Sequence, residues 1–228
     1  MAKNSYLSGQ PILCQLLSYL PQDLVTDSVA QHQSDRYYKT MTTYKQLVFL
    51  FYGVVSRCKS LNNLCKNLLL LDNKLSYLGI DKLPAVSTLS DANINRCSEV
   101  FATLYGKLYH HYSSTLTPTM CHFLEDLDSD KIFAFDSSTI SLFVDLFKGA
   151  GRNTLNGKKK GGLKVHTKMP LFGFVPDLVH LTEAACNDKS FLGQLAVEKG
   201  NIYIFDKGYV NYTVWKEWTN QGVFYVTR

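Results

Sequence analysis

The chain has 228 residues, which is enough for one large domain or two small ones. Its 46% hydrophobic and 19% charged residues exclude a disordered protein, and a net charge of +5 does not by itself indicate a nucleic-acid partner. The six cysteines are scattered without a CxxC pair, which argues against a disulfide-stapled secreted domain or a zinc site. Because the N-terminus lacks the apolar run of a signal peptide and the most apolar stretch, residues 47–55, is too short to span a bilayer, we expect a cytoplasmic protein with no membrane partner.

Helical patterns fill the first half of the chain. Apolar residues recur at helical spacing in residues 11–20, 42–57, 60–71 and 87–113. Thr42 or Thr43, Ser60 and Ser87 are suitable N-caps for the last three segments. The helix that follows Thr43 is apolar nearly all round, so we predict that it forms the core of an all-helical domain.

This helical half contains a candidate DNA-reading element. A helix, a linker of roughly fifteen residues and a second helix span residues 60–96. The second helix begins with small polar residues, a composition that suits entry into a major groove. The linker is longer than the turn of a standard helix-turn-helix, so a plain helical bundle remains the alternative.

The pattern changes near residue 129. Alternating, β-branched and aromatic residues predict strands at residues 131–142, 161–172, 175–182, 201–205 and 222–226. Helices are expected at residues 190–199 and 212–220, which gives the order β-β-β-α-β-α-β. A three-stranded meander followed by parallel strands with helical crossovers is the start of a ribonuclease-H-like sheet. The predicted class is therefore α+β: an all-helical, DNA-binding domain at residues 1–128 and a partial ribonuclease-H-like α/β domain at residues 129–228.

Two aspartates are the strongest candidates for chemistry. Asp136 interrupts an otherwise apolar strand, and Asp206 directly follows another. A carboxylate in such a strand requires an interaction partner, because burying an unpaired charge costs free energy. The partner is either one of the hydroxyl side chains that follow Asp136, through a hydrogen bond, or a metal ion. The first and fourth strands of a ribonuclease-H-like sheet are neighbours, so the two acids should lie side by side, an arrangement that favours Mg²⁺ or Mn²⁺ over zinc.

A basic segment joins two of the predicted strands. Residues 146–176 contain no Asp or Glu but seven lysine or arginine residues. Such a segment is either a solvated loop or a surface that binds phosphates. The residues that we predict to contact DNA are Lys158, Lys159, Lys160, Lys164 and His166.

Several motifs together resemble bacterial insertion-sequence transposases of the DDE class, in the family named for insertion sequence four. The resemblance lies in residues 133–139 (Phe-Ala-Phe-Asp-Ser-Ser-Thr), 161–166 (Gly-Gly-Leu-Lys-Val-His), 182–188 and 204–209. Residues 87–92 are similar to the family's N-terminal DNA-binding region, so the resemblance covers nearly the whole chain. The Asp-Lys-Gly-Tyr segment at residues 206–209 is its most specific element.

This resemblance implies a DNA transposase that binds transposon ends, as double-stranded DNA, and it is compatible with a homodimer. Asp136 and Asp206 would be the first two acids of a catalytic triad that binds Mg²⁺ or Mn²⁺. The family's third acid is a Glu in a Tyr-x-x-Arg-x-x-x-Glu signature, and residues 225–228 fit only its first half. We therefore expect a C-terminally truncated transposase that does not cleave or join DNA alone.

Two alternatives remain open at the level of sequence. One is a non-catalytic DNA-binding remnant. The other is a complete metal-dependent nuclease of the same fold, whose third acid would be Glu183 or Asp188.

Overall fold

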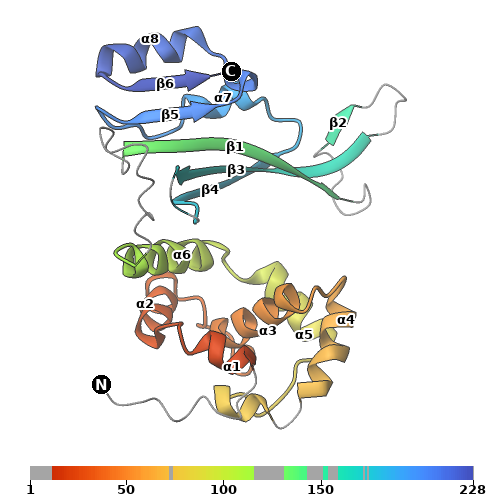
Figure 1. Ribbon diagram of the computed structural model, residues 1–228. Coiled ribbons are helices and arrows are strands. Elements are labelled where there is room, and N and C mark those ends of the chain that lie inside the picture. The colour runs from red at the N-terminus through yellow and green to blue at the C-terminus, as the bar shows by residue number, and fades with distance from the viewer. Residues whose placement is uncertain are drawn as a thin grey trace. The chain divides into compact units, whose positions relative to one another are not determined.

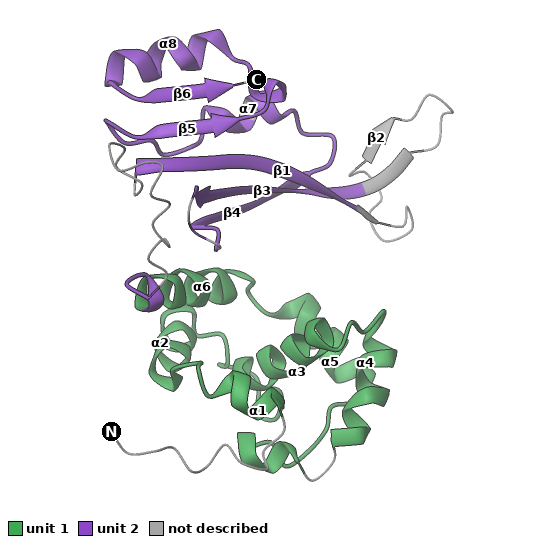
Figure 2. Ribbon diagram, in the orientation of Figure 1, with its two compact units in different colours: residues 1–111 green, residues 112–228 purple. Residues whose placement is uncertain are grey.

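The chain folds into two compact units, residues 1–111 and 112–228 (Figure 2). The computed structural model describes residues 12–71, 74–115, 131–142, 151–153, 159–171, 173 and 175–227. The predicted domain boundary after residue 128 lies outside these residues and stays a prediction. Within the described ranges, none of the helices is both long and apolar enough to cross a membrane.

The first unit is all-helical (Figure 1). Its α-helices are α1 (Ile12–Leu17), α2 (Gln22–His32), α3 (Thr43–Val55), α4 (Leu61–Leu68), α5 (Val86–Asn95) and α6 (Glu99–Tyr112), with 3-10 turns η2 (Leu69–Leu71) and η3 (Leu75–Leu78). The Thr42 and Ser60 side chains accept backbone hydrogen bonds at the starts of α3 and α4, which confirms both predicted caps. By contrast, α5 begins after Ala85, so Ser87 is not its cap.

Helix α3 supplies the centre of the apolar core, as predicted. Val48 and Phe49 are fully buried and belong to one cluster with Leu68 of α4 and Leu89 of α5. Burying each side chain of this size contributes roughly 1.5–3 kcal/mol. The prediction is incomplete for the end of the helix, because Val54 is 77% exposed.

Two helices differ from the sequence prediction. Helix α2 was not predicted, and only Val25 and Ser28 of its residues are buried, so its sequence shows little amphipathic pattern. The single helix expected at residues 87–113 is two helices, α5 and α6. The break occurs at Arg96, whose backbone is extended (φ −78°, ψ 137°).

A buried ion pair accounts for this break. The Arg96 guanidinium donates to Asp35 Oδ1 (2.5 Å) and to the Thr43 hydroxyl through Nη1, and to the Met41 carbonyl through Nη2. Arg96 is 6% exposed. Its side chain thus ties the end of α5 to the connection between α2 and α3, and a continuous helix would carry the guanidinium away from these acceptors.

We predict that Arg96→Met lowers the free energy of unfolding by about 3 kcal/mol, because it removes the cationic partner of Asp35 and the donor to the Met41 carbonyl. Arg36 is the matched control, because both guanidinium groups lie over a ring: Arg96 at 4.1 Å from the centroid of Tyr38 and Arg36 at 5.3 Å from that of the exposed Tyr37. Arg36→Met should cost less than about 1 kcal/mol. Urea unfolding of both variants measures the difference, and equal losses would contradict a structural role for the Arg96 network.

The second unit is a mixed sheet with helices. Its elements are β1 (Ile132–Leu142), β2 (Gly151–Asn153), β3 (Lys159–Pro170), β4 (Leu178–Glu183), α7 (Asp188–Leu192), β5 (Ile202–Phe205), η6 (Lys207–Tyr209), α8 (Tyr212–Gln221) and β6 (Phe224–Thr227). The strand order is β2-β3-β1-β5-β6, and β4 also pairs with β3. Strand β3 is antiparallel to β1 and β4, whereas β1, β5 and β6 are parallel. These pairings confirm the predicted α+β class with a ribonuclease-H-like sheet.

Three local details of this unit differ from the prediction. Residues 151–153, expected in a loop, form β2 and pair with residues 159–161 of β3. Helix α7 begins at Asp188, capped by Asn187, and is shorter than the helix expected at residues 190–199. Strand β5 was expected to be buried on both faces, but only alternate residues, Tyr203 and Phe205, are fully buried.

The two faces of the sheet have different surroundings. On one face, Phe135, Tyr203 and Phe205 pack with residues of α7 and α8 in an aromatic core, and we call this the helix-covered face. Side chains alternate between faces along a strand, so the residues between them lie on the other, open face. Apolar side chains are exposed there at Val179 and Leu181 of β4 and at Phe224 and Val226 of β6.

Candidate catalytic site

Asp136 and Asp206 each follow one of two paired phenylalanines on neighbouring parallel strands. Strands β1 and β5 lie side by side (Figure 1). Their pairing ends with Phe135 opposite Phe205, and an aspartate follows each of these phenylalanines. Asp136 continues β1, where side chains alternate, so it projects away from the helix-covered core that buries Phe135. Asp206 is the first residue after β5 and caps η6.

The two carboxylates are held in the same way. Asp136 Oδ1 accepts a hydrogen bond from the backbone N–H of Ser137, and Asp206 Oδ1 accepts one from Lys207, both at 2.7 Å. Both aspartates are exposed, so the desolvation cost expected for a buried Asp136 does not arise. These bonds engage one oxygen of each carboxylate and orient the other.

The donor set fits a hard divalent cation. Two carboxylates from adjacent strands offer oxygen ligands, which suit Mg²⁺ or Mn²⁺, and water completes such coordination shells. In the described ranges, no group of three or more His, Cys, Asp or Glu side chains is arranged to hold a metal ion. The residues therefore fit an ion held by two protein carboxylates and water.

The two alternative third acids do not join this pair. Glu183 pairs with Leu163, whose partner on β1 is Ile140, four residues beyond Asp136. Asp188 lies on the helix-covered face, where its Oδ1 accepts from Ser137 Oγ at 3.0 Å. This geometry does not support a complete nuclease built on either residue.

Asp188 belongs to a polar cluster that the sequence did not reveal. Its Oδ1 lies 3.0 Å from Lys164 Nζ, and Lys164 also donates to the Cys186 carbonyl at 2.7 Å. A pocket of about 450 Å³ opens beside them. Its lining residues are Ser137, Thr139, Lys164, Ala184, Ala185, Cys186, Asn187 and Asp188.

Lys164 and His166 do not form the predicted DNA-contacting surface. Lys164 is 9% exposed and His166 is fully buried. His166 Nε2 hydrogen bonds with Thr182 Oγ1 at 2.9 Å, and its ring stacks on Phe191 with centroids 4.4 Å apart. Their positions on β3 face the helices, so their side chains are enclosed rather than free to meet DNA. The side chains of the other three predicted contacts, at residues 158–160, lie outside the described residues.

Tyr209, the last residue of the Asp-Lys-Gly-Tyr motif, has a structural role in the core. The Tyr209 ring is 2% exposed and meets the edge of Phe135 at a centroid distance of 4.9 Å. Its buried hydroxyl has no hydrogen-bond partner among the described residues. Burial raises the pKa of Tyr209, and the Ser137 and Asp188 side chains lie close enough to influence it. The tyrosine thus anchors the segment after Asp206 beneath the strand that carries Asp136.

Known proteins match both units. Residues 128–228 match the family model "Transposase DDE domain", and residues 8–81 match "Domain of unknown function (DUF4372)". "Putative transposase y4zB" of Sinorhizobium fredii (strain NBRC 101917 / NGR234) is 31% identical over 145 residues. Residues 128–228 therefore carry a match to a transposase DDE domain. Membership of the insertion sequence four family within this class stays a prediction.

The extent of these similarities differs. The alignment with the Sinorhizobium fredii relative covers 64% of this chain and spans 37% of the relative's length. A solved synaptic complex of piggyBac transposase with hairpin DNA is similar at a TM-score of 0.39 and 11% identity. That similarity covers 96% of this chain and 50% of the solved chain, but it is too weak to bear on fold or function.

The burial of His166 makes stability depend on pH. Burial lowers the pKa of His166 below its usual value near 6.5, so the unfolded chain binds a proton more readily than the folded one. The free energy of unfolding should therefore fall as pH drops through about 6.5, and the contribution is fully present above that pH. In His166→Gln this contribution is absent, so the variant should lose less stability between pH 7.5 and pH 5.5, values chosen on the two sides of that pKa. Parallel pH profiles for the two proteins would contradict this assignment.

Proposed function

We propose that this DDE transposase domain binds Mg²⁺ or Mn²⁺ through Asp136 and Asp206 and serves metal-dependent cleavage and transfer of transposon DNA. The observation that carries the proposal is the parallel register of Phe135 with Phe205, because an aspartate directly follows each of these paired residues. A divalent ion at such a site activates an attacking hydroxyl and stabilises the leaving phosphate oxygen.

The chain's own residues would supply positioning. The backbone N–H groups of Ser137 and Lys207 each fix one carboxylate oxygen, so the remaining oxygens need little reorganisation to bind an ion. Asp136 lies within β1, and Asp206 directly follows β5 as the cap of η6, so regular structure limits the motion of both acids more than a long loop would. This preorganisation supports a binding role at the pair.

The DNA partner is proposed from charge and from the helical unit. The acid-free segment at residues 146–176 can neutralise backbone phosphates, chiefly through Lys158, Lys159 and Lys160. In the first unit, α5 buries Leu89 and Ala92 and leaves Ser87, Asp91 and Asn95 exposed together with Ile94, so polar groups that can meet base edges are available on its exposed side. We propose transposon ends as the duplex that these surfaces bind.

A second candidate is a non-catalytic DNA-binding protein. It is favoured by one observation: in the described part of the chain, no third metal-binding side chain accompanies the two aspartates. Metal titration separates the candidates, because a protein that binds only DNA needs no ion at Asp136 and Asp206.

Mn²⁺ titration of the full chain tests the metal site. Asp136→Asn and Asp206→Asn should each weaken Mn²⁺ binding by more than about 100-fold, since losing a ligand costs more than the roughly 10–100-fold of losing a supporting partner. Glu217→Gln is the control, because Glu217 is an exposed carboxylate on α8. Isothermal titration calorimetry or the Mn²⁺ electron paramagnetic resonance signal measures the affinity, and equal binding by all four proteins would overturn the proposed site.

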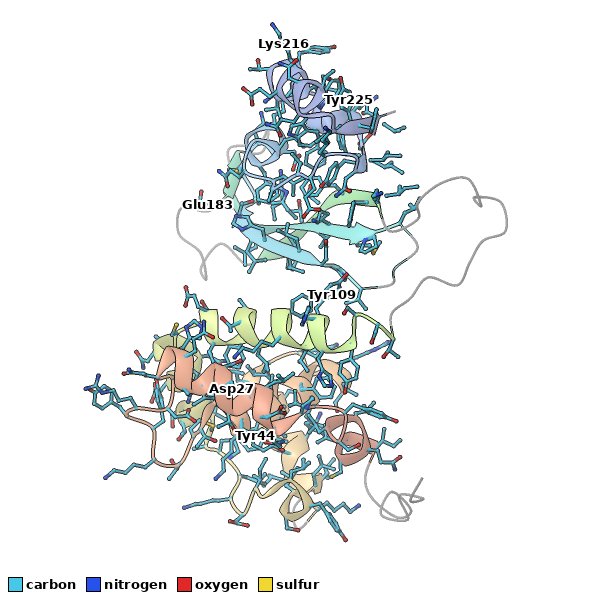
Figure 3. All side chains as sticks on the ribbon, turned by 90° about the vertical axis from the view of Figure 1, so that its left-hand side faces the viewer. Asp27, Tyr44, Tyr109, Glu183, Lys216 and Tyr225 are labelled. Atoms are coloured by element: carbon cyan, nitrogen blue, oxygen red, sulfur yellow. The ribbon has the colours of Figure 1, made fainter. Side chains whose placement is uncertain are left out.

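Salt-dependent DNA binding tests the basic segment. Each phosphate contact contributes about −0.9 to the slope of log affinity against log salt, so changing Lys158, Lys159 and Lys160 to Ala should flatten the slope by up to about 2.7. A control triple variant removes the same charge at Lys39, Lys199 and Lys216, which are exposed elsewhere; Lys216 lies on α8 (Figure 3). Fluorescence anisotropy with a duplex measures both slopes, and an equal slope change in the two triple variants would show that the segment is only a solvated surface.

A further inference from the structure

Strand β1 connects the open face to the helix-covered face through one residue. The backbone N–H of Ser137 donates to Asp136 Oδ1 at 2.7 Å, and its hydroxyl donates to Asp188 Oδ1 at 3.0 Å on the other side of the sheet. Ser137 therefore donates to both carboxylates, with its backbone N–H to Asp136 and with its hydroxyl to Asp188. A change at Asp188 can reach Asp136 through this single residue.

Asp188 is itself fixed by a buried cation. Lys164 Nζ lies 3.0 Å from its Oδ1, and the Lys164 side chain is 11% exposed. An ammonium group buried to that extent requires a counter-charge, so the carboxylate is held firmly in place. Lys164 lies opposite Thr139 of β1 and also donates to the Cys186 carbonyl, which precedes α7. The pair thus joins β3, β1 and the start of α7 at one point.

The strand that carries Asp206 reaches the same cluster. Tyr209, three residues after Asp206, is buried with its ring edge against Phe135. Its hydroxyl finds no hydrogen-bond partner within the described ranges, and Asp188 influences its pKa. Segments adjacent to both proposed ligands therefore pack beside α7, which begins at Asp188, because Phe135 contacts both Tyr209 and Phe191 of α7.

We propose that Asp188 is a positioning residue for the metal site, which acts on Asp136 through Ser137 and is held by Lys164. The inference rests on the proposed binding of a divalent ion at Asp136 and Asp206. Partners that orient a metal ligand commonly change metal affinity by about 10–100-fold when they are lost. Asp188 acts in this way from the opposite face of the sheet, without touching the ion.

A second ion pair on the same strand provides a matched control. Lys168 Nζ lies 3.0 Å from Asp177 Oδ2, and the two side chains are 15% and 19% exposed. Like Lys164, Lys168 belongs to β3 and faces the helices. Within the described residues, no hydrogen bond links the side chains of this pair to Asp136 or Asp206. We therefore expect loss of this pair to change folding stability without changing metal affinity.

The test measures Mn²⁺ affinity of the full chain by calorimetry. Asp188→Asn and Ser137→Ala should each weaken binding by about 10–100-fold, whereas Ser137→Thr, which keeps the hydroxyl, should restore most of the affinity. Asp177→Asn should bind Mn²⁺ as the unmodified chain does. In the double variant Ser137→Ala/Asp188→Asn, the loss should equal that of the larger single change, because both residues act through one chain of bonds.

The outcomes separate this inference from the proposed function. If Asp136→Asn leaves Mn²⁺ affinity unchanged, the metal site itself is wrong. If Asp136→Asn abolishes binding while Asp188→Asn and Ser137→Ala behave as Asp177→Asn does, the positioning role is overturned and the metal site stands. Should Asp188→Asn fail to fold by circular dichroism, Ser137→Ala decides alone, because it preserves the ion pair between Lys164 and Asp188.

Discussion

The parallel pairing of β1 with β5 is the constraint on which the rest of the second unit depends. These strands are separated in sequence by β2, β3, β4 and α7, yet their register sets Phe135 against Phe205. The two phenylalanines share one aromatic core with α7 and α8, so a shift by one residue would expose both of them and bury the aspartates that follow. The hydrophobic effect that fixes this register therefore also aligns the two chain positions that Asp136 and Asp206 directly follow.

The alternation of side chains divides the chemistry of β1 between two faces. Carboxylates on the open face remain hydrated and can exchange water for an ion, whereas polar groups on the helix-covered face must be paired. Lys164 and Asp188 satisfy this requirement for each other. Ser137 belongs to the covered face but lies next to Asp136, so a polar pair within the core can influence a ligand at the surface.

The helical unit is organised by a separate core and a separate buried charge. Helix α3 fills the centre of that core, and Arg96 ends α5 by binding acceptors between α2 and α3. The cost of burying its guanidinium is offset by several hydrogen bonds that a continuous helix could not make. As a result, α5 is a short helix separate from α6, and its exposed residues include Ser87, Asp91 and Ile94.

Local pattern in the sequence determined most helices and strands, their order along the chain and the choice of the two aspartates, because amphipathic period, caps and the Asp-Lys-Gly-Tyr segment are properties of adjacent residues. Tertiary structure alone decided the break at Arg96, the pairing of β2 with β3, the burial of Lys164 and His166, and the ion pair of Asp188 with Lys164. The sequence of a basic segment does not distinguish a lysine that is exposed on the surface from one that is buried in the core. Only the long-range pairing that placed β3 against β1 and α7 determined which lysine received a carboxylate partner and became buried.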